Sequence, residues 1–307
     1  MQFDMGTRLA SLAQSSNKPS VVFFVPYFGR WPCWFPAFAT SCAYNPDFEW
    51  WLITDLEPQP APKNVKFIPM SFEQFLQRAR DILKCSIQKG PYSICDLRPA
   101  FGVIFSDLLE GVRFWGHADI DVVWGRLSIF LSEDQLNKYD IISSRRSAVA
   151  GHCTIYRNCS IVNTLFEDIP NYRVIMTIPR LCRMNESAMA QVLRTRRDVK
   201  VYWHAQHVVD QRELDRRPYS WRWESGHVLD LRYVERAYIH FASWKRSVQY
   251  VDFCYEDMPK FFRITPRGFF LKSEGTIADQ LRLPPISSIY RRFYNWLRYV
   301  VTGRGRL

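Results

Sequence analysis

The chain has 307 residues, of which 47% are apolar and 23% are charged, and its formal net charge is +11 at pH 7. This length and apolar content allow a substantial core, so they exclude an intrinsically disordered protein and predict one large α/β domain or two smaller ones. The positive charge predicts an anionic partner, but because the sequence shows no zinc finger, RNP-type aromatic segment or long lysine-rich tail, we expect no nucleic acid among the partners.

The amino-terminal region shows no sign of export. Residues 1–18 are polar and lack the apolar stretch of a signal peptide. The apolar run that follows, residues 21–38, is interrupted by Pro26, Pro32 and Pro36, so we do not expect it to span a membrane. The eight cysteines are scattered without a C-x-x-C pair and are expected to be free thiols. These features predict a cytoplasmic protein.

Short apolar runs alternate with helix signals over the first third of the chain. Val21–Val25 is rich in β-forming residues and predicts a buried parallel strand that ends at Pro26. Ser71 and Gln74 form a capping signature that begins a helix. This alternation indicates a parallel sheet. Strands are expected at residues 21–25, 50–54 and 65–68, and helices at residues 37–43 and from residue 71 onward.

A further helix is expected before Gly111, which lies just past its end. Pro99 suits its first turn, and Asp96 and Arg98 lie at its amino end. Its apolar positions recur at helical spacing and share one face. They are Leu97, Phe101, Ile104, Phe105 and Leu108.

Two aspartates follow the next expected strand, residues 114–118. Asp119 and Asp121 are two positions apart, which projects both carboxylates to one side of an extended chain, where they can bind one hard cation, Mg²⁺ or Mn²⁺. A solvated turn or a pair of helix caps would show the same pattern. However, apolar residues on both sides indicate a buried strand, where unpaired charge is costly. Ligands bind at the carboxyl ends of strands in open α/β sheets, so chemistry is expected here.

The pattern beyond residue 150 is less regular. There is no internal repeat, and no stretch has the composition of a linker between domains. We therefore expect one domain over residues 1–285, followed by a short segment at residues 286–307. Within the domain, helices are expected near residues 160–166 and 186–193, and strands near residues 200–203 and 237–241.

Four segments carry a family resemblance, in order and spacing: residues 25–29 (VPYFG), 51–55 (WLITD), 94–102 (ICDLRPAFG) and 114–121 (FWGHADID). Together they resemble a bacterial group of GT-A type glycosyltransferase-like proteins that is associated with surface polysaccharides. The resemblance covers residues 21–246. It implies an α/β fold of the GT-A type, Rossmann-like and with a mostly parallel central sheet. It also implies transfer of a hexose from a nucleotide diphosphate sugar.

The resemblance implies roles for residues in the first half of the chain. Asp119 and Asp121 correspond to a D-x-D pair that holds Mn²⁺ or Mg²⁺ against the diphosphate of the nucleotide-sugar, and Asp121 acts in catalysis. For Arg98 there is an independent argument, because a guanidinium beside a helix start suits an oxyanion, although a surface ion pair with Asp96 is an equal alternative. The implied donor-binding residues are Pro26, Tyr27, Asp55, Asp96, Arg98 and Asp119.

Two later segments also resemble this group. Residues 151–158 (GHCTIYRN) imply that His152 lies near the bound sugar. Residues 238–246 (YIHFASWKR) imply that His240 is a third metal ligand and that Lys245 and Arg246 neutralise diphosphate oxygens. For His152 the alternative is a structural role in packing. For residues 238–246 the alternative is a β-strand that ends in solvated basic residues.

Glu186 is the expected catalytic carboxylate toward the acceptor. The group tends to carry an Asp-Glu pair where this chain has Asn185 and Glu186. Glu186 would accept a proton if the reaction inverts and would orient the acceptor if it retains. Favourable placement in the first turn of a helix is an equal alternative.

The segment 286–307 is basic and amphipathic. Its apolar residues fall on one side of an expected helix, and no acid occurs from Pro284 onward. Such a helix can lie on an anionic membrane, although docking on the protein's own core is the alternative. We therefore expect an enzyme peripheral to the cytoplasmic membrane, with a UDP-sugar donor and a saccharide or lipid-linked glycan acceptor.

Two other functions remain open from the sequence. A nucleotidyltransferase would also use carboxylates and a cation, but it usually needs a glycine-rich phosphate loop, and residues 26–30 are poor in glycine. A non-catalytic, membrane-associated binding or scaffold protein with a degenerate site is the second alternative. The intact Asp119, Asp121 and His240 argue against it.

Overall fold

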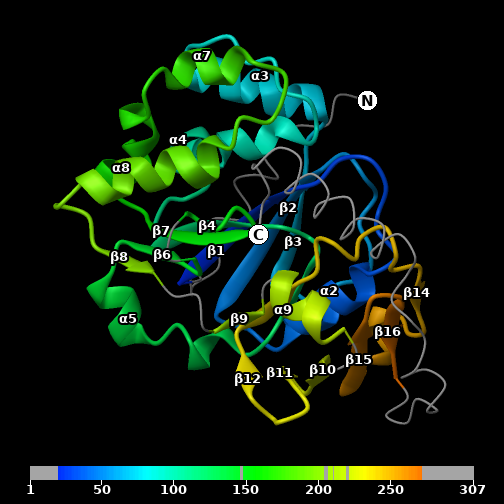
Figure 1. Ribbon diagram of the computed structural model, residues 1–307. Helices are drawn as coiled ribbons and strands as arrows, with labels where there is room; N and C mark the ends of the chain where they lie inside the picture. Colours follow the sequence, from blue (N-terminus) through cyan, green and yellow to red (C-terminus); the bar gives the residue numbers. More distant parts are fainter. Residues whose placement is uncertain (1–19, 146–147, 204–206, 210, 219–220, 272–307) are drawn as a thin grey trace, which may run out of the picture.

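The computed structural model describes residues 20–145, 148–203, 207–209, 211–218 and 221–271. Within these ranges the chain forms three sheets, and helices cover the largest of them (Figure 1). The described residues contain no helix that could span a membrane. The expected amphipathic segment, residues 286–307, lies outside them.

The central sheet has seven strands in the order β3-β2-β1-β4-β7-β6-β8. Neighbouring strands from β3 to β4 are parallel, whereas β7 runs antiparallel to both β4 and β6. This confirms the expected fold class, an α/β fold with a mostly parallel central sheet. Its strands are β1 (Val21–Pro26), β2 (Phe48–Thr54), β3 (Val65–Pro69), β4 (Phe114–Ala118), β6 (Ile141–Ser143), β7 (Cys153–Arg157) and β8 (Val201–Trp203).

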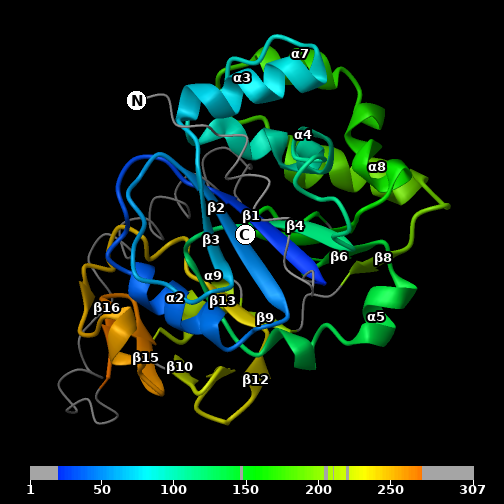
Figure 2. The same cartoon turned by 180° about the vertical axis from the view of Figure 1, so that it is seen from behind.

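Both faces of this sheet are covered, which explains why its strands are almost continuously apolar (Figure 2). On one face Phe24 packs against Phe101 and Phe105 below α3. On the other, Phe23 stacks on Trp50 beside α2. The longer helices are α2 (Phe35–Ala43), α3 (Phe72–Leu83) with the expected Ser71 capping box, α5 (Glu133–Lys138), α7 (Tyr172–Thr177), α8 (Met189–Thr195) and α9 (Gln211–Arg216).

The helix expected around residues 97–108 forms differently. The chain first makes a 3₁₀ helix, η2 (Ser93–Ala100), and then one short α-helix, α4 (Phe101–Ile104). Pro99 lies inside η2, and because proline has no backbone N–H it cannot donate the i→i−4 bond of a continuous α-helix. The helix expected at residues 160–166 is likewise interrupted, into α6 (Ser160–Asn163) and the 3₁₀ helix η4 (Leu165–Asp168).

A three-stranded sheet continues from the central sheet at the two aspartates. Residues 119–121 connect β4 to β5 (Val122–Trp124), which pairs antiparallel with β13 (Tyr238–His240). In this register His240 lies opposite Val122. The third strand is β9 (Val208–Val209), parallel to β13. The pairing of β5 with β13 therefore brings the region of residue 240 to the end of β4.

A third sheet of six strands was not predicted from the sequence. It packs against α2 and β5 through a shared core that contains Trp34, Trp221 and Trp223. Its order is β12 (Glu235–Arg236), β11 (His227–Leu229), β10 (Trp221–Glu224), β15 (Phe261–Thr265), β16 (Gly268–Phe270) and β14 (Tyr250–Val251).

Candidate metal centre

Asp119, Asp121 and His240 converge where the central and three-stranded sheets meet. One ligand atom from each residue lies within 4.8 Å of those of the other two. Nε2 of His240 is 3.5 Å from Oδ2 of Asp119 and 3.4 Å from Oδ2 of Asp121. The three residues predicted to hold a cation are therefore together, although His240 is more than a hundred positions further along the chain.

Backbone contacts hold the connection between β4 and β5 in place. The N–H of Asp119 donates to the carbonyl oxygen of His152 at 2.9 Å, and that of Phe241 donates to the carbonyl oxygen of Asp121 at 3.1 Å. The indole N–H of Trp34 donates to the carbonyl oxygen of Ile120 at 3.2 Å. These hydrogen bonds hold the main chain of residues 119–121, so that the carboxylates of Asp119 and Asp121 lie close to each other and to His240.

The buried polar atoms of this centre fit a bound cation. The Asp121 side chain is 0% exposed, and neither of its oxygens accepts a well-formed hydrogen bond from the described residues. Nε2 of His240 also has no hydrogen-bond partner among them. Leaving such groups unsatisfied in the interior is costly. Two carboxylates and one imidazole are a suitable ligand set for Mn²⁺, and Mg²⁺ would use chiefly the oxygens.

Two basic side chains flank the aspartates. Nζ of Lys245 lies 2.9 Å from Oδ2 of Asp121. The buried guanidinium of Arg98 pairs with Asp119 and donates to the carbonyl oxygen of Gly151. Burial alone would raise the pKa of Asp119, but Arg98 and His240 hold that pKa well below its usual value. The centre thus combines ionised acids with cations that can contact a polyanion.

Proton release on metal binding follows from the charge of His240. Burial lowers the pKa of His240, but Asp121 and Asp119 outweigh it and raise the pKa to about 9. The imidazole is therefore protonated at pH 7 and must lose its proton to bind a metal. We expect Mn²⁺ binding at pH 7 to release about one proton and the affinity to rise about tenfold per pH unit up to pH 9.

Calorimetry of Mn²⁺ binding in two buffers of different ionisation enthalpy measures this proton. In the His240→Asn variant the buffer dependence should disappear. Equal binding enthalpies in both buffers for the unmodified protein would contradict the assignment.

Glu186 lies on the Arg98 side of the centre. It belongs to a π-helical turn, η5 (Met184–Ala188), and such turns are frequent at functional sites. A Cβ atom added to Gly151 would lie 2.5 Å from Oε1 of Glu186, and the carbonyl oxygen of Gly151 is bonded to Arg98. Arg183 lies 3.8 Å from the other carboxylate oxygen. The structure thus brings Glu186 close to the residues that hold Asp119.

The residues predicted to border the nucleotide lie at the ends of β1 and β2. The N–H of Tyr27 donates to the carbonyl oxygen of Ile53 at 2.9 Å, and its ring stacks on Trp31. Burial raises the pKa of Tyr27, and the charges of Lys245 and Asp121 also act on it, so this ring is near the centre. Pro26 ends β1 and is partly buried, whereas Asp55, after β2, and Arg246, beside Lys245, are exposed. Their contact with a donor stays a prediction.

Asp96 is engaged by the protein itself. Its buried carboxylate pairs with Nζ of Lys89 at 2.8 Å and accepts hydrogen bonds from the backbone N–H groups of Cys182 and Met184, each at 2.8 Å. These contacts hold the segment around Cys182 and Met184, where η5 begins. Sequence reasoning did not identify Lys89, because no local pattern marks a lysine whose partner lies seven residues away.

His152 is buried and packs against His240 rather than standing free. Its Nε2 lies 2.9 Å from the hydroxyl oxygen of Tyr238, a residue that sequence reasoning left unassigned. One signal was present, since Tyr238 is two positions before His240 on one strand and therefore shares its face.

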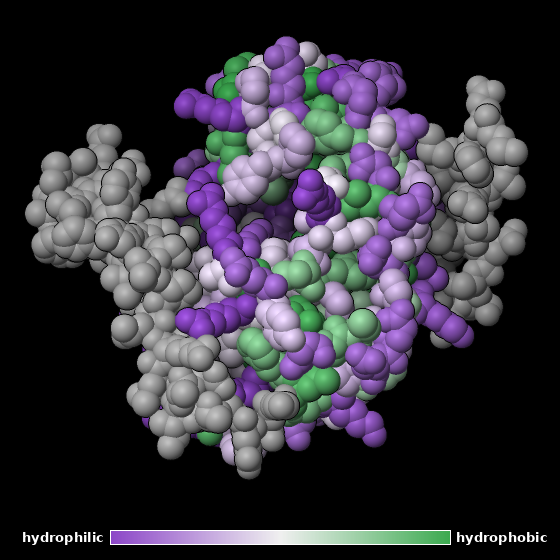
Figure 3. Space-filling view, turned by 90° about the vertical axis from the view of Figure 1, so that its right-hand side faces the viewer, coloured by the Kyte–Doolittle hydropathy of each residue, from purple (hydrophilic) through white to green (hydrophobic). Residues whose placement is uncertain are grey.

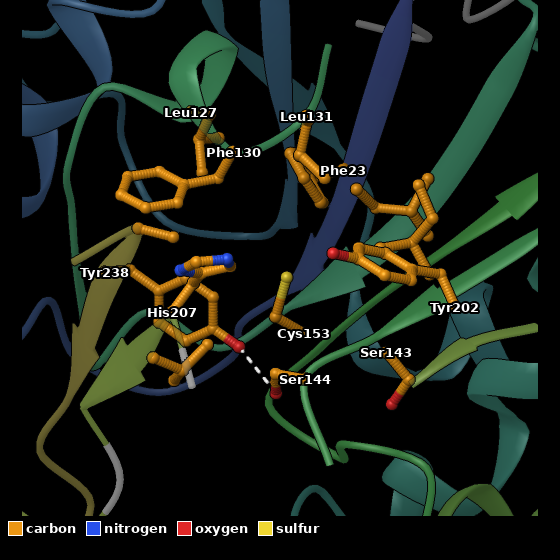
Figure 4. Close-up of a pocket in the computed structure, with 14 residues that line it drawn as sticks. Phe23, Leu127, Phe130, Leu131, Ser143, Ser144, Cys153, Tyr202, His207 and Tyr238 are labelled. Atoms are coloured by element: carbon orange, nitrogen blue, oxygen red, sulfur yellow. Dashed lines mark hydrogen bonds between the residues drawn. The ribbon is translucent and has the colours of Figure 1, made fainter. Parts of the chain in front are cut away.

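A pocket beneath the central sheet differs in kind from the metal centre (Figure 4). Its empty volume, including space open to solvent, is about 480 Å³, and its lining includes Phe23, Leu127, Phe130 and Tyr238. Among the described residues that line it there is no carboxylate, ammonium or guanidinium group, so this lining does not suit a nucleotide diphosphate. One face of the molecule is hollowed, and hydrophilic side chains border the depression (Figure 3).

Comparison with known proteins gives a family match over most of the chain. Residues 23–273 match a family described as "Family of unknown function (DUF6625)". No curated protein matches the sequence. A crystal structure of galactosyltransferase LgtC in complex with donor and acceptor sugar analogs is similar at 10% identity and a TM-score of 0.36, covering 72% of this chain and 86% of that one. An active-site mutant of LgtC is similar at 11% identity and a TM-score of 0.40, covering 77% and 93%.

Proposed function

The chain belongs to this family of unknown function, and we propose that it is a metal-dependent glycosyltransferase. The proposed reaction moves a hexose from a nucleotide diphosphate sugar, a UDP-sugar in the first instance, to a saccharide or lipid-linked glycan. One observation carries the proposal: the ligand atoms of Asp119, Asp121 and His240 lie within 4.8 Å of one another, and Arg98 and Lys245 flank them.

The chemistry of the donor fits this arrangement of charge. A bound Mn²⁺ or Mg²⁺ would supply positive charge to the diphosphate oxygens as the leaving group departs. Lys245 and Arg246 follow β13, and we propose that they pair with the same oxygens. Tyr27, with Pro26 and Asp55, borders the base and ribose in this proposal, while Arg98 keeps Asp119 ionised and oriented.

Glu186 is the proposed carboxylate on the acceptor side. It is near Gly151 and Arg98, and its side chain is 28% exposed, so it can be reached by a substrate. In this role it would accept the proton of the acceptor hydroxyl or orient that hydroxyl. The geometry of Asp96 favours a structural role, since its oxygens already bind Lys89 and two backbone N–H groups.

Metal removal tests the activity directly. We expect the full chain to hydrolyse at least one sugar nucleotide in a panel of UDP-, GDP- and ADP-sugars when Mn²⁺ is present, and to lose this hydrolysis after treatment with EDTA. Added Mn²⁺ should restore it. Release of nucleoside diphosphate, followed by chromatography, is the measurement. Equal hydrolysis with and without metal would refute the metal-dependent mechanism.

We propose further that the protein acts at the cytoplasmic face of a membrane. The support is the basic amphipathic sequence of residues 286–307, which follows the expected catalytic domain of residues 1–285. The full chain is expected to cosediment with vesicles that contain an anionic lipid and to stay in solution with neutral vesicles. Equal sedimentation with both kinds would argue against an electrostatic contact.

A further inference from the structure

We propose that His152 and Tyr238 are positioning residues that hold the imidazole of His240 toward Asp119 and Asp121, so that the cation affinity of the centre depends on both. The inference rests on the proposed metal centre but not on the identity of the donor or acceptor. Neither residue would touch the cation.

His152 and His240 contact each other through their rings. The rings of His152 and His240 are stacked, with centroids 4.1 Å apart and an angle of 15° between their planes. Rotation of an imidazole about its last side-chain bond is only weakly restricted by itself. Packing against His152 restricts this ring on one face, while its Nε2 lies 3.5 Å from Oδ2 of Asp119 and 3.4 Å from Oδ2 of Asp121. The same His152 also accepts the backbone hydrogen bond of Asp119.

A hydrogen bond with Tyr238 orients His152. The hydroxyl of Tyr238 donates to Oγ of Ser144 at 2.9 Å, as the dashed line in Figure 4 shows. The same hydroxyl lies 2.9 Å from Nε2 of His152, within hydrogen-bond distance. This contact orients the ring of His152 that stacks on His240.

The burial of His152 favours this role over contact with a donor. His152 is only 3% exposed, His240 covers one face of its ring, and its Nε2 already contacts the hydroxyl of Tyr238. Groups that orient a metal-ligating histidine typically change metal affinity 10–100-fold when they are removed. Removal of a residue that contacts only the donor would not change the affinity for the metal in the absence of a donor.

The experiment compares Mn²⁺ affinity, measured by the electron paramagnetic resonance signal of free Mn²⁺, in four variants of the full chain without any nucleotide. Tyr238→Phe keeps the ring and removes the bond, and we expect about a tenfold weaker affinity. His152→Ala removes the stacked ring and should weaken it further. The double variant should be no weaker than His152→Ala, because Tyr238 acts through His152.

Tyr156→Phe is the matched control. The hydroxyl of Tyr156 is also buried, but it has no hydrogen-bond partner among the described residues, and its ring stacks on Trp115. Its removal should leave Mn²⁺ affinity within about twofold of the unmodified protein. Thermal unfolding of every variant separates a loss of affinity from a loss of fold.

Each outcome bears on a different claim. If Tyr238→Phe and His152→Ala both bind Mn²⁺ as tightly as the unmodified protein, the positioning role is wrong, while the proposed function can still hold. If both weaken binding but no sugar nucleotide is hydrolysed by the unmodified protein, the positioning role stands and the glycosyltransferase proposal fails. If the unmodified protein binds no Mn²⁺, both are overturned.

Discussion

Replacing Asp121 by asparagine is expected to lower metal-dependent hydrolysis of the donor about 1000-fold, a loss of about 4 kcal/mol in transition-state stabilisation. The side chain is fully buried, faces His240 and Lys245, and has no well-formed hydrogen bond in the described part of the chain. Asparagine has nearly the same volume but no charge, so it removes an anionic ligand while it preserves packing. Mn²⁺ affinity and the steady-state rate of nucleoside diphosphate release are the measurements.

A second measurement and a control variant test the role of Asp121. Asp121 is the strongest cause that raises the pKa of His240, so in Asp121→Asn that pKa should fall from its value of about 9, which NMR titration of the metal-free protein can follow. Asp107→Asn serves as the control, because Asp107 pairs with Arg78 at the surface and should affect neither property. Unchanged Mn²⁺ affinity in Asp121→Asn would remove the proposed metal centre.

Replacing Lys89 by methionine is expected to destabilise the fold by about 3–5 kcal/mol. Both side chains of the Lys89–Asp96 pair are 0% exposed, and Nζ of Lys89 also donates to the carbonyl oxygen of Arg180 at 3.2 Å. Methionine keeps most of the apolar stem but leaves the carboxylate of Asp96 buried without its cation. The free energy of unfolding, measured by urea titration, reports the loss.

Lys66→Met is the control for this second prediction. Lys66 lies 3.9 Å from Glu49 in a partly exposed pair, and such pairs contribute at most about 1 kcal/mol. A cost below 1 kcal/mol for Lys89→Met would show that the ion pair with Lys89 does not hold Asp96. The prediction that Asp96 faces the donor would then gain support.

Local patterns in the sequence predicted the strands of the central sheet well. Val21–Val25 and residues 50–54, 65–68 and 114–118 are short apolar runs, and each one forms a strand within the central sheet. The helix that begins after Ser71 forms with its capping box, because the cap is a contact between residues three positions apart. Apolar runs and capping boxes involve residues that are close along the chain, so they can be recognised from the sequence.

The prediction of one continuous helix over residues 97–108 was wrong. The stretch from Leu97 to Leu108 has a helical face, but Pro99 and the contacts of Asp96 and Arg98 favour a 3₁₀ helix and a separate short α-helix. The six-stranded sheet was missed because its strands have two to five residues and are paired mainly through antiparallel contacts. Runs so short show little periodicity.

Side-chain alternation and strand propensity act over a few residues, so local patterns are enough to place two aspartates after an apolar strand, at the end of the sheet where ligands bind in α/β folds. The residues that surround the two aspartates come from distant parts of the chain and are known only from the folded structure. The pairing of β5 with β13 places His240 beside Asp121, and a bond to Gly151 places Arg98 against Asp119. These contacts join residues separated by tens of positions or more, and packing of the whole core selects them.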